Sequence, residues 1–357
     1  MAKKRLRSGY TTGACAAAAA KAAVLLAGGE LPVQVVDIPF PDGSRHTFTV
    51  HYCGDFGGGE KFRASVIKDA GDDPDVTNGA EIVATIREIA GEPEDIIIRA
   101  GDGVGTVTKP GLAIAPGEPA INPVPRQMIR EAVHEIWRPD GAIALEVEIS
   151  IPDGRELAKK TLNYRLGIIG GLSVLGTTGI VRPVSAEAWT ATITASMDVA
   201  RAAGLDEVIL STGRTSEKGA FSVLSLEEEA GVMMGDYLEF SLQEAARHGF
   251  GKINLAGMWA KVLKAAMEIP QTHVRHGALE TGQALEFLAE LGAETSLLKR
   301  LAGVNTAREI YERLVNFGET GLIEKVCVRA REYAMRVSGL EVTVYLVHAS
   351  GKVVVSV

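Results

Sequence analysis

The second half of the sequence alternates short apolar runs with segments of helical spacing, and this alternation constrains the fold more than any other feature. The apolar runs cover residues 165–171, 206–213, 235–241 and 252–257, and the helical segments cover 185–204, 241–249 and 257–267. A chain that alternates strands with helices forms a parallel sheet with covering helices. Helical patterns then dominate residues 279–338, and two β-branched runs around "ASG" predict a closing hairpin.

The first half follows a different rhythm. β-Branched runs at 31–39, 44–53 and 60–71 are separated by Gly-rich turns, which predicts antiparallel strands. Helices are predicted over Ala14–Ala27, 74–91 and 123–137, and strands over 95–103 and 141–152. These elements form an α+β unit. Because a chain of 357 residues exceeds the size of one hydrophobic core, we expect two domains, 1–160 and 161–357.

Charge and composition exclude several classes of protein. The net charge of −8 and the lack of a dense Lys/Arg face argue against nucleic-acid binding. No apolar run is long enough to span a membrane or to act as a signal peptide, so a cytoplasmic protein is expected. Three widely spaced cysteines indicate neither a disulfide framework nor a zinc site. Cys15, in the first turn of the alanine helix, is either a buried thiol or one activated by the helix dipole.

Two loops rich in Gly, Ser and Thr follow predicted strands, where open α/β sheets bind nucleotides. The loops are "GIIGGLSVLGTTGIVRP" (167–183) and "STGRTSEKGA" (211–220), and Asp236 in "MMGDYLEF" is a candidate ribose ligand. The candidate nucleotide-binding residues are Gly170, Gly171, Gly176, Thr177, Thr178, Gly179, Ser211, Thr212, Gly213, Arg214 and Asp236. A tight structural turn at 170–179 and a capped loop at 211–214 are the alternative interpretations.

Other polar segments are candidates for proton transfer and ligand binding. In "AGDDPDVTNGAE" (70–81), Asp72 or Asp73 could accept a proton, and Thr77 is expected to cap the following helix. Residues 103–126 show little helical or strand pattern, and the segment is long for a structureless loop. It is therefore expected to be a binding loop rather than a spacer, with Lys109, Asn122 and Arg126 as its ligand-binding side chains. His273 in "QTHVRHG" is a candidate proton-transfer group, although a surface histidine is the plainer interpretation.

Six segments together resemble the CbiD family of cobalt-precorrin-5B C(1)-methyltransferases, in the same order along nearly the whole chain. They are "LRSGYTTGACAAAAAKAA", "GDDPDVTNGAEI", "KPGLAIAPGEPAINPVPR", "NYRLGIIGGLSVLGTTGIVRPVS", "STGRTSEKGA" and "QTHVRHG". The last departs from the family pattern, because Val274 follows His273 where the family has serine. The resemblance implies a first domain like the second domain of ribosomal protein S5 and a Rossmann-like second domain that forms an α/β/α sandwich.

The resemblance also implies a reaction. S-adenosylmethionine is expected to be the methyl donor, and the acceptor is expected to be C-1 of a cobalt-containing, ring-contracted tetrapyrrole on the anaerobic route to cobalamin, giving cobalt-precorrin-6A. The cobalt belongs to the substrate, and no protein-bound metal is expected. Such a reaction requires mainly alignment of the two ligands. Other enzymes of the pathway and a second copy of the chain are candidate partners.

The implied site divides between the two domains. Donor binding is expected in the second domain, at the two glycine-containing loops and Asp236, and His273, Asp72 and Asp73 are the candidate catalytic residues. The candidates for binding the carboxylates of the tetrapyrrole are Thr11, Thr12, Lys109, Asn122, Arg126, Arg165 and Arg182. For Thr11 and Thr12, a purely structural role in starting the alanine helix remains the alternative.

Two other functions remain open. An ATP-dependent small-molecule kinase is one, since an S5-like domain and Thr-Gly loops also occur in kinases, but the sequence contains no GxxxxGK[ST] loop. A non-catalytic tetrapyrrole carrier is the other. Binding of S-adenosylmethionine distinguishes the methyltransferase from both.

Overall fold

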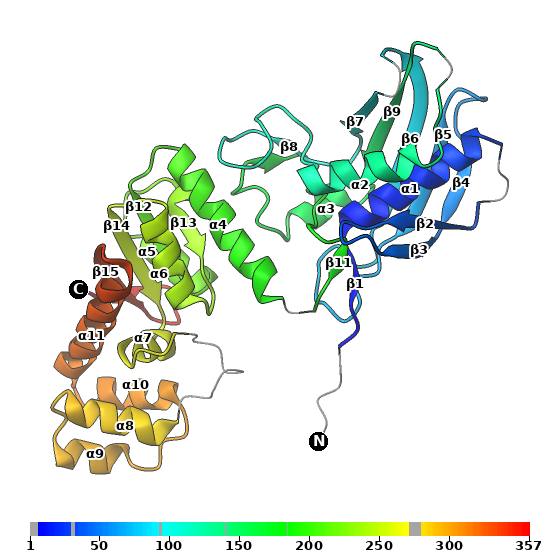
Figure 1. Ribbon diagram of the computed structural model, residues 1–357. Helices are drawn as coiled ribbons and strands as arrows, with labels where there is room; N and C mark the ends of the chain where they lie inside the picture. The colour runs from blue at the N-terminus through cyan, green and yellow to red at the C-terminus, as the bar shows by residue number, and fades with distance from the viewer. Residues whose placement is uncertain (1–5, 30–32, 93–94, 140, 184, 271–279) are drawn as a thin grey trace. The chain divides into compact units, whose positions relative to one another are not determined.

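The structure is a computed structural model that describes residues 6–29, 33–92, 95–139, 141–183, 185–270 and 280–357. The chain forms two compact units, Met1–Ala186 and Glu187–Val357 (Figure 1). The first unit thus extends beyond the expected boundary at residue 160. The reason is strand pairing, because β10 (Ile168–Ile169) pairs with β8 (Thr106–Val107) and β11 (Ile180–Val181) pairs with β1 (Gly9–Tyr10).

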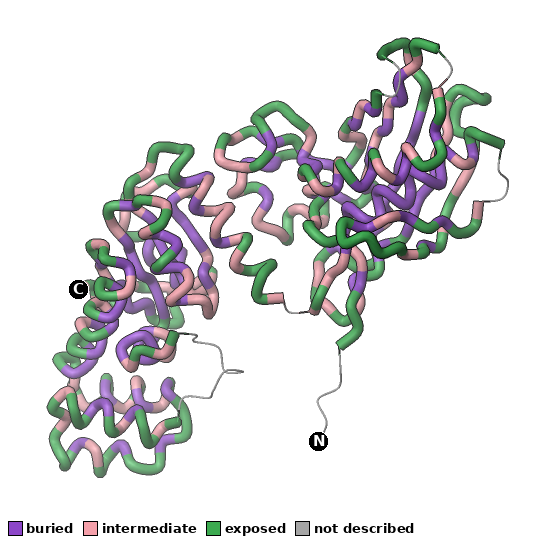
Figure 2. Tube along the Cα trace, in the orientation of Figure 1, coloured by how far each residue is buried: buried purple, intermediate pink, exposed green. Residues whose placement is uncertain are grey.

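The first unit is built on a five-stranded sheet of order β4-β5-β6-β9-β7. Its strands are β4 (Tyr52–Asp55), β5 (Phe62–Ile67), β6 (Glu81–Ala90), β9 (Ile143–Ser150) and β7 (Ile96–Ala100), and only β7 and β9 run parallel. Helix α1 (Thr12–Ala27) packs against β5 and β6, and α2 (Pro123–His134) packs against α1. All the alanines of α1 except the last, Ala27, are completely buried, because their small side chains let the helix approach its neighbours closely (Figure 2).

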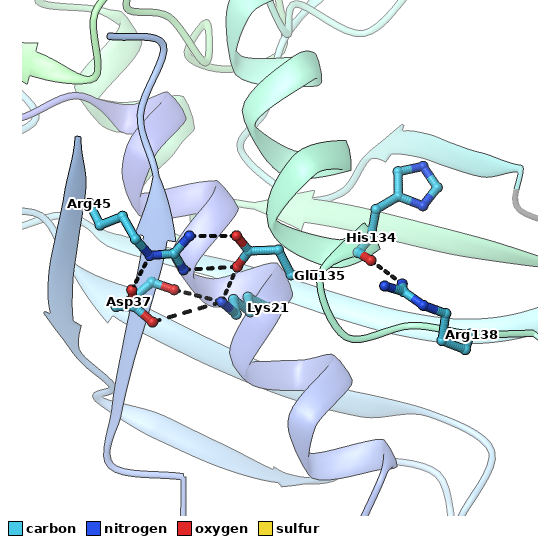
Figure 3. A network of polar contacts seen from close by, with 6 residues as sticks. All are labelled: Lys21, Asp37, Arg45, His134, Glu135 and Arg138. Carbon is cyan, nitrogen blue, oxygen red and sulfur yellow. Dashed lines mark hydrogen bonds and ion pairs between the residues drawn. The ribbon is translucent and has the colours of Figure 1, made fainter. Parts of the chain in front are cut away.

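A network of charged side chains holds the hairpin of β2 (Val35–Pro39) and β3 (Arg45–Thr49) beside these helices (Figure 3). Lys21 of α1 is buried, forms an ion pair with Glu135 and donates to the carbonyl of Asp37 at 2.8 Å. Arg45 donates two hydrogen bonds to Glu135, at 2.6 and 2.9 Å, and also pairs with Asp37. These bonds, chiefly those from Arg45, lower the pKa of Glu135 to about 2.

The helix expected at 74–91 is wrong, because residues 81–90 form β6 at the centre of the sheet. This strand pairs with β5 along one edge and with β9 along the other, and Ile82 to Ile86 are all buried. Its β-branched residues suit such a position. Thr77 consequently caps no helix; its amide and hydroxyl both donate to Asp75 at 2.7 Å.

The segments 103–122 and 163–183 form a smaller layer of the first unit. Val107, Ile114, Ala120 and Ile168 make a small core of their own there. Helix α3 (Gly154–Ala158) precedes this second segment. The strand expected at 165–171 is reduced to β10, which is antiparallel to β8 and is not part of any parallel sheet. Beyond β10, Leu172 makes only an isolated bridge with Val104, in which the Leu172 amide donates to the Gly103 carbonyl at 2.9 Å.

The second unit contains a mostly parallel sheet of order β13-β12-β14-β15-β16, as the alternating pattern predicts. The strands are β12 (Glu207–Ser211), β13 (Gly231–Met233), β14 (Lys252–Gly257), β15 (Glu341–Val347) and β16 (Val353–Ser356). Only β15 and β16 are antiparallel, which confirms the closing hairpin. The strand expected at 235–241 is wrong, because the positive φ of Gly235 turns the chain into a helix that begins at Leu238.

Helices cover both faces of this sheet. Leu210 packs into one core with helices α4, α6, α7 and α11, whereas its neighbour Ile209 packs into another core with α5. The helices are α4 (Ala186–Ala202), α5 (Arg214–Phe221), the 3-10 helix η1 (Glu228–Ala230), α6 (Leu238–Arg247), α7 (Trp259–Ala266), α8 (Thr281–Glu290), α9 (Thr295–Leu301), α10 (Ala307–Asn316) and α11 (Thr320–Ser338). Within the described ranges, none of the helices has the length and apolar character needed to cross a membrane.

Candidate functional site

The carboxyl edge of the parallel sheet in the second unit brings several predicted residues together. From β12 the chain continues to β13 on one side, and it then returns to β14 on the other side. Open α/β sheets bind ligands where the strand order reverses in this way. Here, Ser211 ends β12, Thr212 and Gly213 follow it, and Arg214 begins α5.

The residues at this reversal combine buried polar atoms with open space. The Thr212 amide donates to the Ala256 carbonyl at 3.1 Å, which ties the loop to β14. Ser211 is fully buried, and its hydroxyl has no hydrogen-bond partner among the described residues. A buried hydroxyl without a partner is costly. A Cβ added to Gly213 would meet no atom within 4 Å, so this loop leaves room for a ligand to approach the backbone.

Asp236 lies at the same edge, in the turn after β13. It forms an ion pair with Lys261 of α7. The turn is held by Trp189 of α4, whose indole donates to the Met234 carbonyl at 3.2 Å. Trp189 is 45% exposed. Trp189 stacks near Tyr237, with ring centroids 6.5 Å apart. Trp189 is not among the residues predicted from the sequence, because its exposure and its contact with this turn are visible only in the fold.

The glycine loop at 170–179 belongs to the first unit and follows β10, which is antiparallel to β8, so its expected place at the end of a parallel strand is wrong. Its glycines fit close neighbours. A Cβ on Gly171 would lie 2.1 Å from the Gly103 carbonyl oxygen, and one on Gly176 would lie 2.5 Å from the Thr11 side chain. These close contacts agree with the alternative interpretation from the sequence, a tight structural turn at 170–179. Thr177 and Thr178 are exposed, and a contact of this loop with the donor stays a prediction.

The start of α1 is closed by the same loop. The Thr11 hydroxyl accepts from the Ala14 amide at 3.2 Å, and the Thr12 hydroxyl accepts from the Leu175 amide at 2.9 Å. Both threonines are buried, which agrees with their structural interpretation. Cys15 is buried in the first turn, and burial raises its pKa to about 12, so an activated thiol there is wrong.

The aspartates at 69–75 bind the beginning of the chain and a buried lysine. Asp72 is exposed and accepts a hydrogen bond from the Arg7 amide at 2.7 Å. Asp69 pairs with the Arg7 guanidinium, and Lys68, which is buried, pairs with Asp75 at 2.6 Å. Proton transfer by Asp72 or Asp73 stays a prediction. His273 lies outside the described residues.

The segment expected as a long loop, 103–126, contains β8 and the first turn of α2 in the structure, and it borders a shallow depression in the first unit. The depression has a volume of about 310 Å³ and includes Arg126, one of the predicted residues. Arg130, one helical turn further along α2, also lines it and was missed by the sequence analysis. Asn122 precedes α2 and makes no capping bond with its side chain, and the stem of Lys109 lies against Gly167. Arg165 is half-buried and Arg182 is exposed; neither lines the depression.

The part of the chain that the structure describes contains no group of three or more His, Cys, Asp or Glu side chains arranged to hold a metal ion. The candidate binding groups are Ser211, Thr212, Gly213, Arg214 and Asp236 at the carboxyl edge of the second unit, and Arg126 and Arg130 at the depression of the first.

Known proteins resemble the chain over its whole length. Residues 1–183 match the family model CbiD, and residues 271–357 match the model of the CbiD C-terminal domain. The cobalt-precorrin-5B C(1)-methyltransferase of Desulfotalea psychrophila is 56% identical over 99% of this chain and 98% of the relative. The protein of the same name from Geobacter metallireducens is 47% identical over 97% of both chains.

A solved structure is also similar. The crystal structure of the cobalamin biosynthesis protein CbiD from Archaeoglobus fulgidus is 25% identical and covers 88% of this chain and 85% of that chain, with a TM-score of 0.38. The sequence matches are by themselves decisive. The chain belongs to the CbiD family.

Proposed function

We propose that this chain is the methyltransferase that methylates C-1 of cobalt-precorrin-5B in cobalamin biosynthesis, with S-adenosylmethionine as donor. The observation that carries the proposal is the 56% identity, over nearly the whole of both chains, to a relative that is named for this reaction. The six motifs that suggested the family from sequence all lie within that match.

The donor site in this proposal is the carboxyl edge of the second unit. Its strand order, 2-1-3-4-5 in chain order, is that of a common class of nucleotide-binding open sheets and supports a Rossmann-like assignment. The open space beside Gly213 and the unpartnered Ser211 hydroxyl fit a polar ligand that lies against the backbone. Bound there, S-adenosylmethionine supplies a methyl group already activated on a sulfonium.

The side chains at this edge bind and orient the donor. Asp236 accepts hydrogen bonds from the ribose hydroxyls, and Lys261 holds its carboxylate in place. Arg214 is exposed, has no hydrogen-bond or ion-pair partner among the described residues, and offers a planar cation for the donor's carboxylate. The open space beside Gly213 lets the donor approach the backbone at that residue.

The first unit, assigned as S5-like, binds the tetrapyrrole in this proposal. The macrocycle carries many carboxylates, so a chain with a net charge of −8 must present local cations to it. Arg126 and Lys109 belong to the long loop that is expected to bind it, and Arg165 and Arg182 follow in the next segment. The protein then contributes by aligning the two ligands and excluding water rather than by a nucleophile of its own.

Calorimetric titration with S-adenosylmethionine and S-adenosylhomocysteine tests the proposal, with ATP and magnesium as the comparison. We expect micromolar binding of both sulfur ligands, and transfer of radiolabel from the methyl group to enzymatically prepared cobalt-precorrin-5B. Binding of ATP alone would favour a kinase. Binding of the tetrapyrrole without transfer of label would favour a carrier.

A matched pair of variants locates the donor site. Asp236→Asn is expected to weaken binding of S-adenosylhomocysteine about tenfold, because a charged hydrogen-bond acceptor contributes about 1.5–3 kcal/mol. Asp206→Asn is the control, since Asp206 precedes β12 at the opposite edge of the same sheet and pairs with Arg201. Equal affinities of the two variants would remove Asp236 from the site.

A further inference from the structure

We propose that the depression beside α2 binds a single carboxylate-bearing side chain of the tetrapyrrole, with Arg126 and Arg130 as its ligands and Glu118 as a competing acid. The inference rests on the proposed function and adds a subsite to it.

The size and lining of the depression suit part of a ligand. Its volume of about 310 Å³ is at the lower end of the range for small-molecule pockets, which is too little for a whole macrocycle. The lining is apolar apart from three charged residues: it consists of Ala113, Ile114, Ala115, Ile121, Pro123, Glu118, Arg126 and Arg130. An acetate or propionate arm has the matching character, an aliphatic stem that ends in an anion.

Arg126 is held in a fixed orientation by the loop itself. Its Nε donates to the Ile121 carbonyl at 2.7 Å, and its Nη2 donates to the Pro119 carbonyl at 3.1 Å. Carbonyl oxygens orient the guanidinium without neutralising its charge. No hydrogen bond from Nη1 is present among the described residues, so part of the planar fork remains available for a carboxylate.

Arg130 adds a second charge that no acidic side chain within the described ranges pairs with. It lies one helical turn after Arg126, is exposed, and has no hydrogen bond or ion pair with any described residue. Two guanidinium groups thus line the depression against one carboxylate, that of Glu118. The Glu118 carboxylate lies 3.6 Å from Arg126 Nη2, and its side chain is 58% exposed. It can therefore turn into solvent when a ligand carboxylate takes its place, without breaking a buried contact. One incoming carboxylate would balance the remaining charge.

The experiment uses the full chain and uroporphyrin, a tetrapyrrole with eight carboxylates, as the probe, at two salt concentrations. Arg130→Gln is expected to weaken uroporphyrin binding about five- to tenfold and to reduce its salt dependence, as for a charge-assisted pair near the surface. Glu118→Gln is expected to tighten binding, because it removes the competing acid. Arg138→Gln is the control and should bind like the unaltered protein, because Arg138 lies beyond the C-terminal end of α2 and outside the depression.

The outcomes separate this inference from the proposed function. If uroporphyrin does not bind, or if Arg130→Gln and Glu118→Gln bind it like Arg138→Gln, the subsite is wrong, even where S-adenosylhomocysteine still binds. If S-adenosylhomocysteine does not bind but the opposite effects of the two variants are seen, the subsite stands and the methyltransferase proposal fails. If free acetate displaces uroporphyrin at equal carboxylate concentration, the depression binds small anions in general, and the inference is overturned.

Discussion

The two glycine-containing loops look alike in sequence but differ in what surrounds them. At Gly171, in the first unit, the carbonyl of Gly103 occupies the place where a side chain would begin. At Gly213, in the second unit, that place is open. The same residue type therefore serves close packing in one loop and access to the backbone in the other. The space beside the Cα atom, rather than the number of glycines, distinguishes a structural turn from a candidate ligand site.

The largest expected effect is on stability in the first unit. Gly171→Ala should lower the free energy of unfolding by about 2–3 kcal/mol, because the new methyl group overlaps backbone that cannot easily move. Denaturant unfolding of the purified variant measures the change. A loss below about 0.5 kcal/mol would be within the usual effect of a surface substitution and would contradict the packing role.

The matching substitution in the second unit should affect binding instead. Gly213→Ala should leave the free energy of unfolding within about 0.5 kcal/mol of the unaltered protein, since the methyl group enters open space and the backbone is extended. It should weaken S-adenosylhomocysteine about tenfold, equal to about 1.4 kcal/mol, because the ligand can no longer approach the chain. Unaltered affinity in calorimetry would place the donor elsewhere.

The smallest effect concerns acid sensitivity, which should be specific to the first unit. Asp69 pairs with Arg7 and accepts from the Gly71 amide at 2.9 Å, and these bonds, chiefly that from Arg7, lower its pKa from 3.8 to about 2. They hold the segment that precedes β1, which pairs with β11 just after the glycine loop. Because the folded pKa is depressed, the stabilisation is present above pH 3.8 and is lost as the pH falls toward 2.

Asp69→Asn tests this prediction. The difference in thermal midpoint between the unaltered protein and this variant should be clear at pH 6 and should shrink as the pH falls from 3.8 toward 2, because the Asp69 carboxylate becomes protonated first in the unfolded and then in the folded chain. Protection of the Tyr10 amide, which donates to the Asp69 carbonyl at 2.7 Å, should follow the same course in hydrogen exchange. A difference that does not change with pH would show that the ion pair contributes nothing.

Part of the site could be predicted because its signals are local. Ser211, Thr212 and Gly213 follow an apolar run, and the end of a parallel strand is where ligands bind. Arg126 could be predicted because it ends a segment with little regular pattern in the sequence, although in the structure it lies in the first turn of α2. Arg130 and Trp189 were missed because both lie on helices, where a single exposed side chain has no distinctive pattern. Only the folded arrangement places Arg130 at the depression and Trp189 beside the turn after β13.

The sequence by itself determined the alanine helix, the closing hairpin, the parallel sheet and the family, because propensity, alternation and motif order are properties of neighbouring residues. Tertiary structure decided whether 81–90 is helix or strand, through pairing with β5 and β9. It also decided that residues 161–186 belong to the first unit, through pairing with β1 and β8. The physical reason is that sheet hydrogen bonds and buried contacts join residues far apart in the chain, so no local pattern can specify them.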